Sequence, residues 1–385
     1  MSHPVFVVAD NIVSALGFTS AENFSQLLKG ASNVQQHAPG NRSPQAFYGS
    51  LFPETFWEQH TIPSFTKFES LLAISIKDAL NQANINPANS KTGLIISSTK
   101  GNISLLEDNE VSDTLKQEIG LSSSAKKIAA HFGFQSQPVI ISHACISGLV
   151  ALITAKRMLQ AGLFDHIVVA GADIITRFIL SGFQSFQAVA DELCKPFDVN
   201  RKGINLGEAA STIILSVNKP VGNDVIQLTG GAVSNDANHI SGPSRTGHEL
   251  FIAVKQAIEE AGISKEQIDF ISLHGTATLY NDDMESKAIR LAGLQSVPVN
   301  SLKGYYGHTL GAAGLVESVI SMHSLQQNII IPTKGFETPG TAEIMNVCST
   351  LQHTHLNCCL KTASGFGGCN AAVVFEKVHK LEVQF

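Results

Sequence analysis

The sequence has few charged residues, no excess of basic ones and no long hydrophobic run. Charged side chains make up 15% of its 385 residues, against about 25% in an average soluble domain, and 44% are hydrophobic. Such a composition excludes disorder as the main state. The net charge of −6 argues against a nucleic-acid partner. No apolar run approaches the roughly 18 residues that span a bilayer, and the N-terminus lacks the basic region of a signal peptide, so we expect no membrane span.

Cysteines are also scarce. Six of them in a chain of this length are too few for a disulfide scaffold, and none form a C-x-x-C pair, so we expect reduced thiols and a cytoplasmic protein. Four possible metal ligands crowd together at His353, His355, Cys358 and Cys359. Adjacent cysteines on a strand point to opposite faces, so we expect no metal there. No phosphate-binding glycine loop is present, and no nucleotide cofactor is expected.

Short apolar runs alternate with amphipathic segments, which indicates βαβ units and a parallel sheet. The predicted strands are Val5–Ala9, Leu94–Ser98, Pro138–Ser142 and Ile167–Ala170. The predicted helices are Ser20–Leu28 (with Ser20 as N-cap), Phe68–Ala83 and Ser147–Gln160. Residues 29–64 are rich in proline, glycine, serine and glutamine, and we expect a surface excursion there.

The chain also repeats itself. Residues 71–85 match a stretch that begins near Leu250, shifted by 178 positions, and Gly148-Leu149-Val150 match Gly314-Leu315-Val316, shifted by 166. The strands that precede these Gly-Leu-Val segments begin at Pro138 and Pro298, a shift of only 160 positions. The second copy therefore holds six extra residues between strand and helix, which fall in Lys303–His308. The same order of elements in both halves predicts a duplicated βα unit whose equivalent loops face one site.

Four loop segments at predicted strand ends carry the chemically useful side chains. They are Ser142–Gly148, His274–Thr278, Lys303–His308 and Gly365–Asn370. Cys145 stands at a helix N-terminus, where the helix dipole and free N–H groups favour a thiolate; a structural core cysteine is the alternative.

The other three segments each have a second interpretation. His274 and His308 could serve a site or cap the elements beside them, and Lys303 could be an ordinary surface lysine. The glycines around Phe366 could free N–H groups for an oxyanion hole, or could form only a tight turn between strands 359–363 and 371–376.

Taken together, the four segments resemble the β-ketoacyl-acyl-carrier-protein synthases, the condensing enzymes of the thiolase superfamily. The resemblance runs from Val5 to Glu376 and includes further motifs: Lys195–Asp198 with Arg201, Gly207–Ala209, Ser234–His239, and Asn281–Asp282 with Glu285. It implies an α/β, thiolase-like, internally duplicated βαβαβ fold with α/β/α/β/α layers. The halves would be residues 1–225, with the cysteine and cap insertions, and residues 226–385, with both histidines.

The resemblance also implies roles for individual residues. The catalytic residues would be Cys145 as nucleophile, His274, His308 and Lys303. The backbone N–H groups of Cys145 and Phe366 would form the oxyanion hole. Phe366 would also gate the acyl tunnel, while Thr276 and Thr278 would bind the phosphopantetheine arm. Structural support would come from Glu317, Glu208 and Asn370.

The implied reaction is the decarboxylative Claisen condensation of malonyl-acyl carrier protein with an acyl group on Cys145, in fatty acid or polyketide/polyene biosynthesis. It needs no metal or other cofactor, because the phosphopantetheine arrives on the carrier protein. The implied partners are the acyl carrier protein and a second synthase-like chain in a homodimer or heterodimer. Apolar side chains in residues 173–193 suit an interface, a buried loop or a cap over the pocket.

Two other functions fit part of the pattern. A non-catalytic, chain-length-factor-like subunit would lack the nucleophile. A thiolase acting on acyl-CoA would need a second cysteine, for which Cys369 is the candidate, although the Lys303–His308 spacing and Phe366 favour the synthases. The sequence departs from the family at His143, at Asp10-Asn11 after the first predicted strand, and in residues 101–125. These departures suit a specialised synthase that extends polyene or aryl-primed chains.

Overall fold

Two halves with the same strand order form the sheet of this protein. The computed structural model describes residues 3–221 and 224–378. The N-terminal half has the order β5 (Val139–Ile141), β4 (Thr92–Ser97), β6 (His166–Asp173), β8 (Ala209–Ser216), β1 (Phe6–Ser14). The C-terminal half has the order β11 (Pro298–Asn300), β10 (Phe270–Ser272), β15 (Cys358–Gly365), β16 (Cys369–Val378), β9 (Val225–Asn235). In each half the first three strands are parallel and the last two pairings antiparallel, so the predicted duplicated fold is confirmed.

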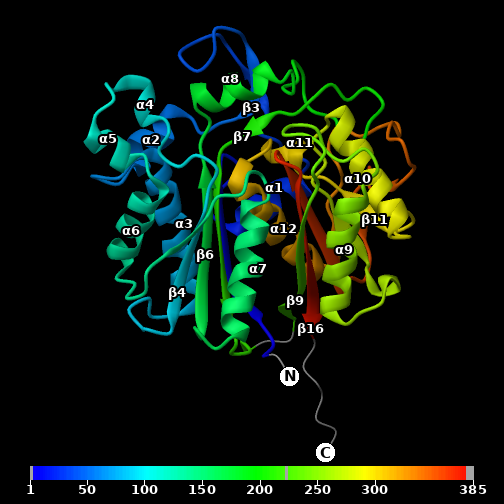
Figure 1. Cartoon of the computed structure of the whole chain (residues 1–385). Helices are drawn as coiled ribbons and strands as arrows, with labels where there is room; N and C mark the ends of the chain where they lie inside the picture. The colour runs from blue at the N-terminus through cyan, green and yellow to red at the C-terminus, as the bar shows by residue number, and fades with distance from the viewer. Residues whose placement is uncertain (1–2, 222–223, 379–385) are drawn as a thin grey trace, which may run out of the picture.

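Helices lie on both outer faces and between the two halves (Figure 1). The outer helices are α3 (Lys67–Ala83) and α6 (Leu121–Phe132) on one side, and α9 (His248–Ala261) and α10 (Leu279–Leu291) on the other. The helices between the sheets are α7 (Ser147–Gln160) and α12 (Ala313–Gln327). Strand residues alternate between these layers: Val169 packs into the central core and Val168 into the outer one. The order is α/β/α/β/α, as predicted.

The two central helices cross at equivalent glycines. A Cβ on Gly148 would lie 2.9 Å from the backbone nitrogen of Leu315, and one on Gly314 would lie 2.8 Å from the backbone nitrogen of Leu149. These four residues are the ones that the 166-residue shift pairs in the sequence. The helices therefore approach backbone to backbone, which only glycine permits at these two positions.

Smaller elements gather above the carboxyl ends of the parallel strands, around α8 (Arg177–Ser185) and α11 (Lys303–Tyr306). Helix α11 occupies the six-residue insertion that the repeat predicted. A three-stranded sheet joins β2 (Gln35–His37), β3 (Phe47–Ser50) and β7 (Leu206–Gly207). The other elements are α1 (Ser20–Leu28), α2 (Glu54–His60), α4 (Leu105–Asp108), α5 (Asp113–Glu118), η1 (Lys265–Gln267), η2 (Leu310–Ala312), β12 (Ile329–Ile330), β13 (Asn346–Val347) and β14 (Gln352–His353).

Three local predictions were wrong. The N-cap of α1 is Thr19, whose hydroxyl accepts from the Glu22 amide in a capping box, and not Ser20. Strand β1 continues to Ser14, because pairing with β8 carries on and the buried Asn11 amide donates to Phe18 O. Residues 29–64 form packed structure, since their aromatic side chains enter the core: Phe47, Phe52, Phe56 and Trp57.

None of the helices in the described part of the chain has the length and apolar character needed to cross a bilayer.

Replacing Gly148 with alanine tests the helix crossing. The added methyl group meets backbone and cannot be accommodated by a rotamer change, so we expect Gly148→Ala to lower the free energy of unfolding by about 1–3 kcal/mol, measured by urea denaturation. Gly182→Ala in α8 is the control, because no atom outside its own helix turn and neighbours lies within 4 Å of the added carbon. Equal denaturation midpoints for Gly148→Ala and the wild type would contradict this crossing.

Candidate active site

Cys145 lies in the sharp turn between β5 and α7. Ala144, just before it, has φ +46°, a left-handed conformation that costs a residue with a side chain roughly 1 kcal/mol or more. The Ser147 hydroxyl accepts from His143 N at 2.8 Å and donates to Ala144 O at 2.6 Å, which holds this turn. The thiol is buried, with 8% of the residue exposed, yet it lines the main cavity.

The structure brings Cys145 together with both predicted histidines. The thiol sulfur and one ring nitrogen from each of His274 and His308 all lie within 4.8 Å of one another. The two imidazole rings are 5.1 Å apart and nearly perpendicular. His274 follows β10, and His308 follows α11. The loops of the two halves therefore converge on one site, as the repeat predicted.

Burial sets the protonation of these three groups. It raises the pKa of the Cys145 thiol to about 12, although a hydrogen bond from the Phe366 backbone and the Lys303 charge act in the opposite direction. Burial also lowers the pKa of His274 and of His308 well below the ordinary value, and the nearby Lys303 lowers both further. The resting site thus holds a neutral thiol and two neutral imidazoles. Burial thus opposes the thiolate that the helix N-terminus favours at Cys145.

Lys303 is fully buried, so its interpretation as a surface lysine is wrong. Its ammonium group donates to His274 O at 3.0 Å and forms an ion pair with Glu317 on α12. The other carboxylate oxygen of Glu317 lies 2.6 Å from the Nζ of Lys361, a second fully buried lysine. Glu317 therefore bridges two lysines beneath the histidines.

The His274 loop is held from its amide side by α10. Glu285 accepts from His274 N at 2.8 Å and from Gly275 N at 2.7 Å. Asp282 accepts from Thr276 N at 3.0 Å and from Phe197 N at 2.8 Å. The loop is thus fixed by carboxylates on one side and by Lys303 on the other.

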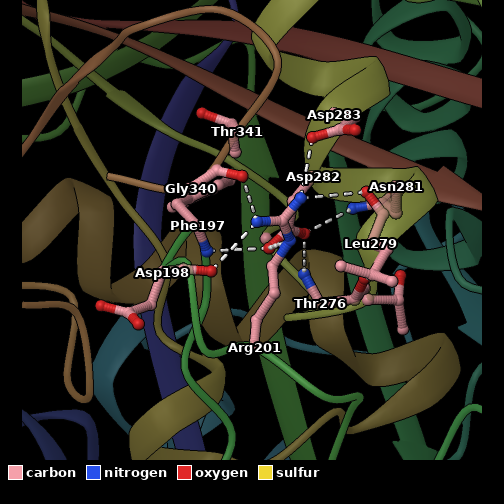
Figure 2. Close-up of polar contacts among 12 residues, drawn as sticks. Phe197, Asp198, Arg201, Thr276, Leu279, Asn281, Asp282, Asp283, Gly340 and Thr341 are labelled. Atoms are coloured by element: carbon pink, nitrogen blue, oxygen red, sulfur yellow. Dashed lines mark hydrogen bonds and ion pairs between the residues drawn. The ribbon is translucent and has the colours of Figure 1, made fainter. Parts of the chain in front are cut away.

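Arg201 fixes the start of α10 (Figure 2). Its guanidinium donates to the carbonyls of Asp198, Gly340 and Leu279 and to the Asp283 carboxylate, the last at 2.8 Å. Its Nε lies 3.9 Å from the Asp282 carboxylate. Burial and the neighbouring Glu285 charge nevertheless raise the pKa of Asp282 to about 7. The motif of Lys195–Asp198 with Arg201 therefore supports the His274 loop.

His308 is held by backbone contacts. Its amide donates to Asn205 O at 2.7 Å, and its carbonyl accepts from Gly207 N at 2.9 Å. Neither ring nitrogen has a hydrogen-bond partner among the described residues. Both nitrogens are therefore free to bind a reacting molecule.

The Phe366 loop is both a tight turn and a wall of the site. It closes the β15–β16 hairpin, with Gly367 at φ +86° and Gly368 at φ +74°. A Cβ on Gly365 would lie 3.0 Å from Cys145 N, so the loop packs closely on the cysteine turn. The half-buried Phe366 ring contacts two phenylalanines of the α8 segment, Phe183 at 5.4 Å and Phe186 at 5.2 Å between ring centroids.

A cavity of about 480 Å³ opens over these residues. Its lining includes Cys145, both histidines, Phe366, Thr276 and Thr278. The two threonine hydroxyls are hydrogen bonded to each other at 2.8 Å. Phe183 and Phe186 also line it, so the interpretation of residues 173–193 as a cap fits this segment, whereas Ile179 and Leu180 of α8 are buried.

The two remaining predicted residues brace loops. Buried Glu208 accepts from Phe52 N at 2.9 Å and from Ile175 N at 3.0 Å. Asn370 accepts from the Ser364 hydroxyl at 2.8 Å and donates to Gly368 O. Glu208 therefore ties the β2–β3 region to the cap, and Asn370 shapes the Phe366 turn.

Two groups of side chains carry possible metal ligands. Cys358 and Cys359 pack into different cores on opposite faces of β15, as their adjacency predicted. Among the described residues, the only group with suitable ligand spacing is Cys145, His274 and His308 themselves. That no metal takes part stays a prediction.

Sequence reasoning missed Lys361. Its position in a largely apolar strand, Cys358–Ala363, was the available signal, because a lysine there must either disrupt the sheet or find a buried partner.

Comparison with known proteins gives a consistent result. Residues 3–219 match the family described as "Beta-ketoacyl synthase, N-terminal domain", and residues 226–337 match its C-terminal domain. The chain is 26% identical to the 3-oxoacyl-[acyl-carrier-protein] synthase 2 of Vibrio harveyi, over 97% of this chain and 98% of that protein.

Solved structures share the fold. A ketosynthase in complex with its chain length factor from Xenorhabdus doucetiae superposes with a TM-score of 0.85 at 24% identity, covering 98% of each chain. A ketosynthase in complex with its type II polyketide acyl-carrier protein also superposes with a TM-score of 0.85, at 22% identity, covering 98% of this chain and 100% of that one.

The reactivity of Cys145 toward iodoacetamide tests its protonation. With a pKa of about 12, the thiolate fraction is small at neutral pH and grows tenfold per pH unit, so the alkylation rate should keep rising between pH 7 and 10. Intact mass measured over time gives the rate, and Cys145→Ser controls for the other cysteines. A rate that levels off by pH 8 would contradict a buried neutral thiol.

Proposed function

Because this chain belongs to the β-ketoacyl synthase family, we propose that its converging loops catalyse the decarboxylative Claisen condensation of malonyl-acyl carrier protein with an acyl group held on Cys145. The observation that carries the proposal is the convergence of one thiol and two imidazoles in a single cavity, where burial lowers the pKa of both rings.

The first step is transfer of the acyl group. The Cys145 sulfur attacks the carrier thioester, and its proton passes to a neighbouring neutral imidazole. An imidazole that is already protonated could not accept this proton. The N–H groups of Cys145 and Phe366 stabilise the tetrahedral oxyanion. The carbon–sulfur bond to the carrier then breaks, and the pantetheine thiol leaves with the proton.

The second step is condensation. The malonyl group loses carbon dioxide, and the electron pair passes to its thioester as an enolate. His274 and His308 each donate one N–H to the enolate oxygen, which is why two neutral rings converge. The carbanion attacks the acyl carbonyl on Cys145, the carbon–sulfur bond to Cys145 breaks, and the departing thiolate takes up a proton from water, which restores the thiol. Lys303 keeps the His274 backbone in place and does not attack the substrate.

The substrate arm enters past Thr276 and Thr278, which line the cavity below the exposed side chains of Leu279 and Tyr280. No cofactor belongs to the proposal, because phosphopantetheine comes on the carrier protein. The partners are an acyl carrier protein and a second synthase-like chain, as in the chain-length-factor and carrier-protein complexes of the structural neighbours. The proposed halves remain residues 1–225 and 226–385. A cytoplasmic location is supported by six cysteines that are all free thiols.

We also assign the enzyme to specialised chains, of the polyene or aryl-primed kind. Three phenylalanine rings, Phe183, Phe186 and Phe366, form one wall of the cavity, and flat conjugated primers stack on such rings better than saturated ones do. A product profile with matched saturated and conjugated acyl primers tests this assignment.

Cys145→Ala should keep the fold and lose the acyl-enzyme. Wild-type protein incubated with acyl-carrier protein should gain the mass of the acyl group, whereas the variant should not. Cys194→Ala is the matched control, since Cys194 is also buried but does not line the cavity. An unmodified wild-type mass would overturn the proposed function.

The release of carbon dioxide separates this function from that of a thiolase. Malonyl-carrier protein should lose carbon dioxide in the presence of the wild-type enzyme, and acetyl-CoA alone should give no condensation product. His274→Ala and His308→Ala should each slow the release about 100-fold or more, since each removes one donor to the enolate. Condensation of acetyl-CoA without decarboxylation would instead favour the thiolase, with Cys369 as second cysteine.

A further inference from the structure

Lys361 is a buried charge that the reaction described above does not use. It lies in the middle of β15 and is 0% exposed. Its Nζ is 2.6 Å from a carboxylate oxygen of Glu317, 3.2 Å from Ser272 O and 3.3 Å from Leu273 O. These two carbonyls belong to the end of β10, directly before His274.

An ammonium group at this place is costly. Its strand neighbours Cys359, Leu360 and Ala363 are buried and apolar, and burying an unpaired charge costs several kcal/mol. An aliphatic side chain would fill the position without that cost. The contacts that Lys361 makes therefore have to explain its presence.

Those contacts hold the backbone that leads from β10 to His274. Lys361 bonds the carbonyls of Ser272 and Leu273, and Lys303 bonds the next one, that of His274. Glu317 contacts both ammonium groups and so couples them. Three consecutive carbonyls are thus bound by two cations that share one anion.

We propose that Lys361 is a positioning residue of this enzyme: together with Glu317 it holds Lys303 and the strand end that carries His274, so that the imidazole meets the Cys145 thiol and the enolate in the right place. The inference rests on the proposed function and goes beyond it, because the sequence resemblance assigns Lys361 no role.

The electrostatics point the same way. Besides burial, the positive charges of Lys303 and Lys361 both lower the pKa of His274 and of His308. Without Lys361 the pKa of each imidazole rises, so each ring becomes protonated at a higher pH. The charged or titratable groups that surround the two rings and the His274 loop come from β15, α11, α12, α10 and the cysteine turn: Lys361, Lys303, Glu317, Glu285, Asp282 and Cys145.

The test compares Lys361→Met with Lys377→Met. Lys377 is a matched control, since it is also buried in a strand and donates to Leu325 O and Asn328 near the other end of α12. For each variant, condensation kcat and KM, the rate of Cys145 acylation from pH 5 to 8, and the urea midpoint are measured. Lys361→Gln, which keeps a donor but no charge, is the second variant.

For Lys361→Met we expect kcat to fall about 10–100-fold with KM within threefold of wild type, the range found when an outer partner of a reactive group is removed. The acid limb, which is the part of the pH profile where the acylation rate falls as the pH decreases, should move to a pH higher by about half to one unit. The reason is that a positive charge near the imidazoles is lost. Lys377→Met should change the urea midpoint but neither kcat nor the acid limb. Lys361→Gln should show the same pH shift with a smaller loss of kcat.

Three results would overturn the inference. Equal kcat and acid limb in Lys361→Met and Lys377→Met would show that Lys361 has no special position. Failure of both Lys361 variants to fold would show a purely structural role. A wild-type protein that forms no acyl-enzyme would overturn the proposed function first, and the inference with it.

Discussion

The close crossing of α7 and α12 is the constraint on which the rest of the structure depends. Gly148 lies three residues after Cys145, and Gly314 lies six residues after His308, so both contacts are made near the reactive ends of these helices. A side chain at either glycine would separate the helix axes, because the nearest atom it would meet is a backbone nitrogen. This crossing therefore fixes the start of α7, which follows Cys145, relative to the start of α12, which follows His308.

Burial then decides the chemistry. Burial raises the pKa of the thiol and lowers the pKa of both imidazoles, so it favours the uncharged form of all three groups. Charge is concentrated one layer below, where Glu317 joins two lysines. That layer holds the backbone of His274 and leaves its ring free. Burial thus favours the uncharged form of the thiol and the imidazoles in the cavity, whereas the groups beneath them form ion pairs.

Much of this could be predicted from the sequence. The repeat indicated the duplicated fold and the position of α11, and the loop segments contained Cys145, His274 and His308. The failures share a cause, since each depends on what surrounds a residue in space. The protonation of Cys145 depends on its burial, and the role of Lys361 depends on a partner 44 positions earlier in the chain. Residues 29–64 looked like a surface loop by composition, and most of them are exposed or partly exposed, but a few aromatic side chains anchor the segment in the core.

The six-residue insertion that forms α11 makes the duplicated fold asymmetric. Under the 166-residue shift, the counterpart of Cys145 is Gly311, whose amide donates to the buried carboxylate of Asp173 at 2.7 Å. A Cβ at Gly311 would lie 2.8 Å from that carboxylate, so the second copy has no room for a nucleophile. Of the two copies, the first therefore presents the thiol at this helix start and the second supplies both imidazoles, so the duplicated halves together form one site.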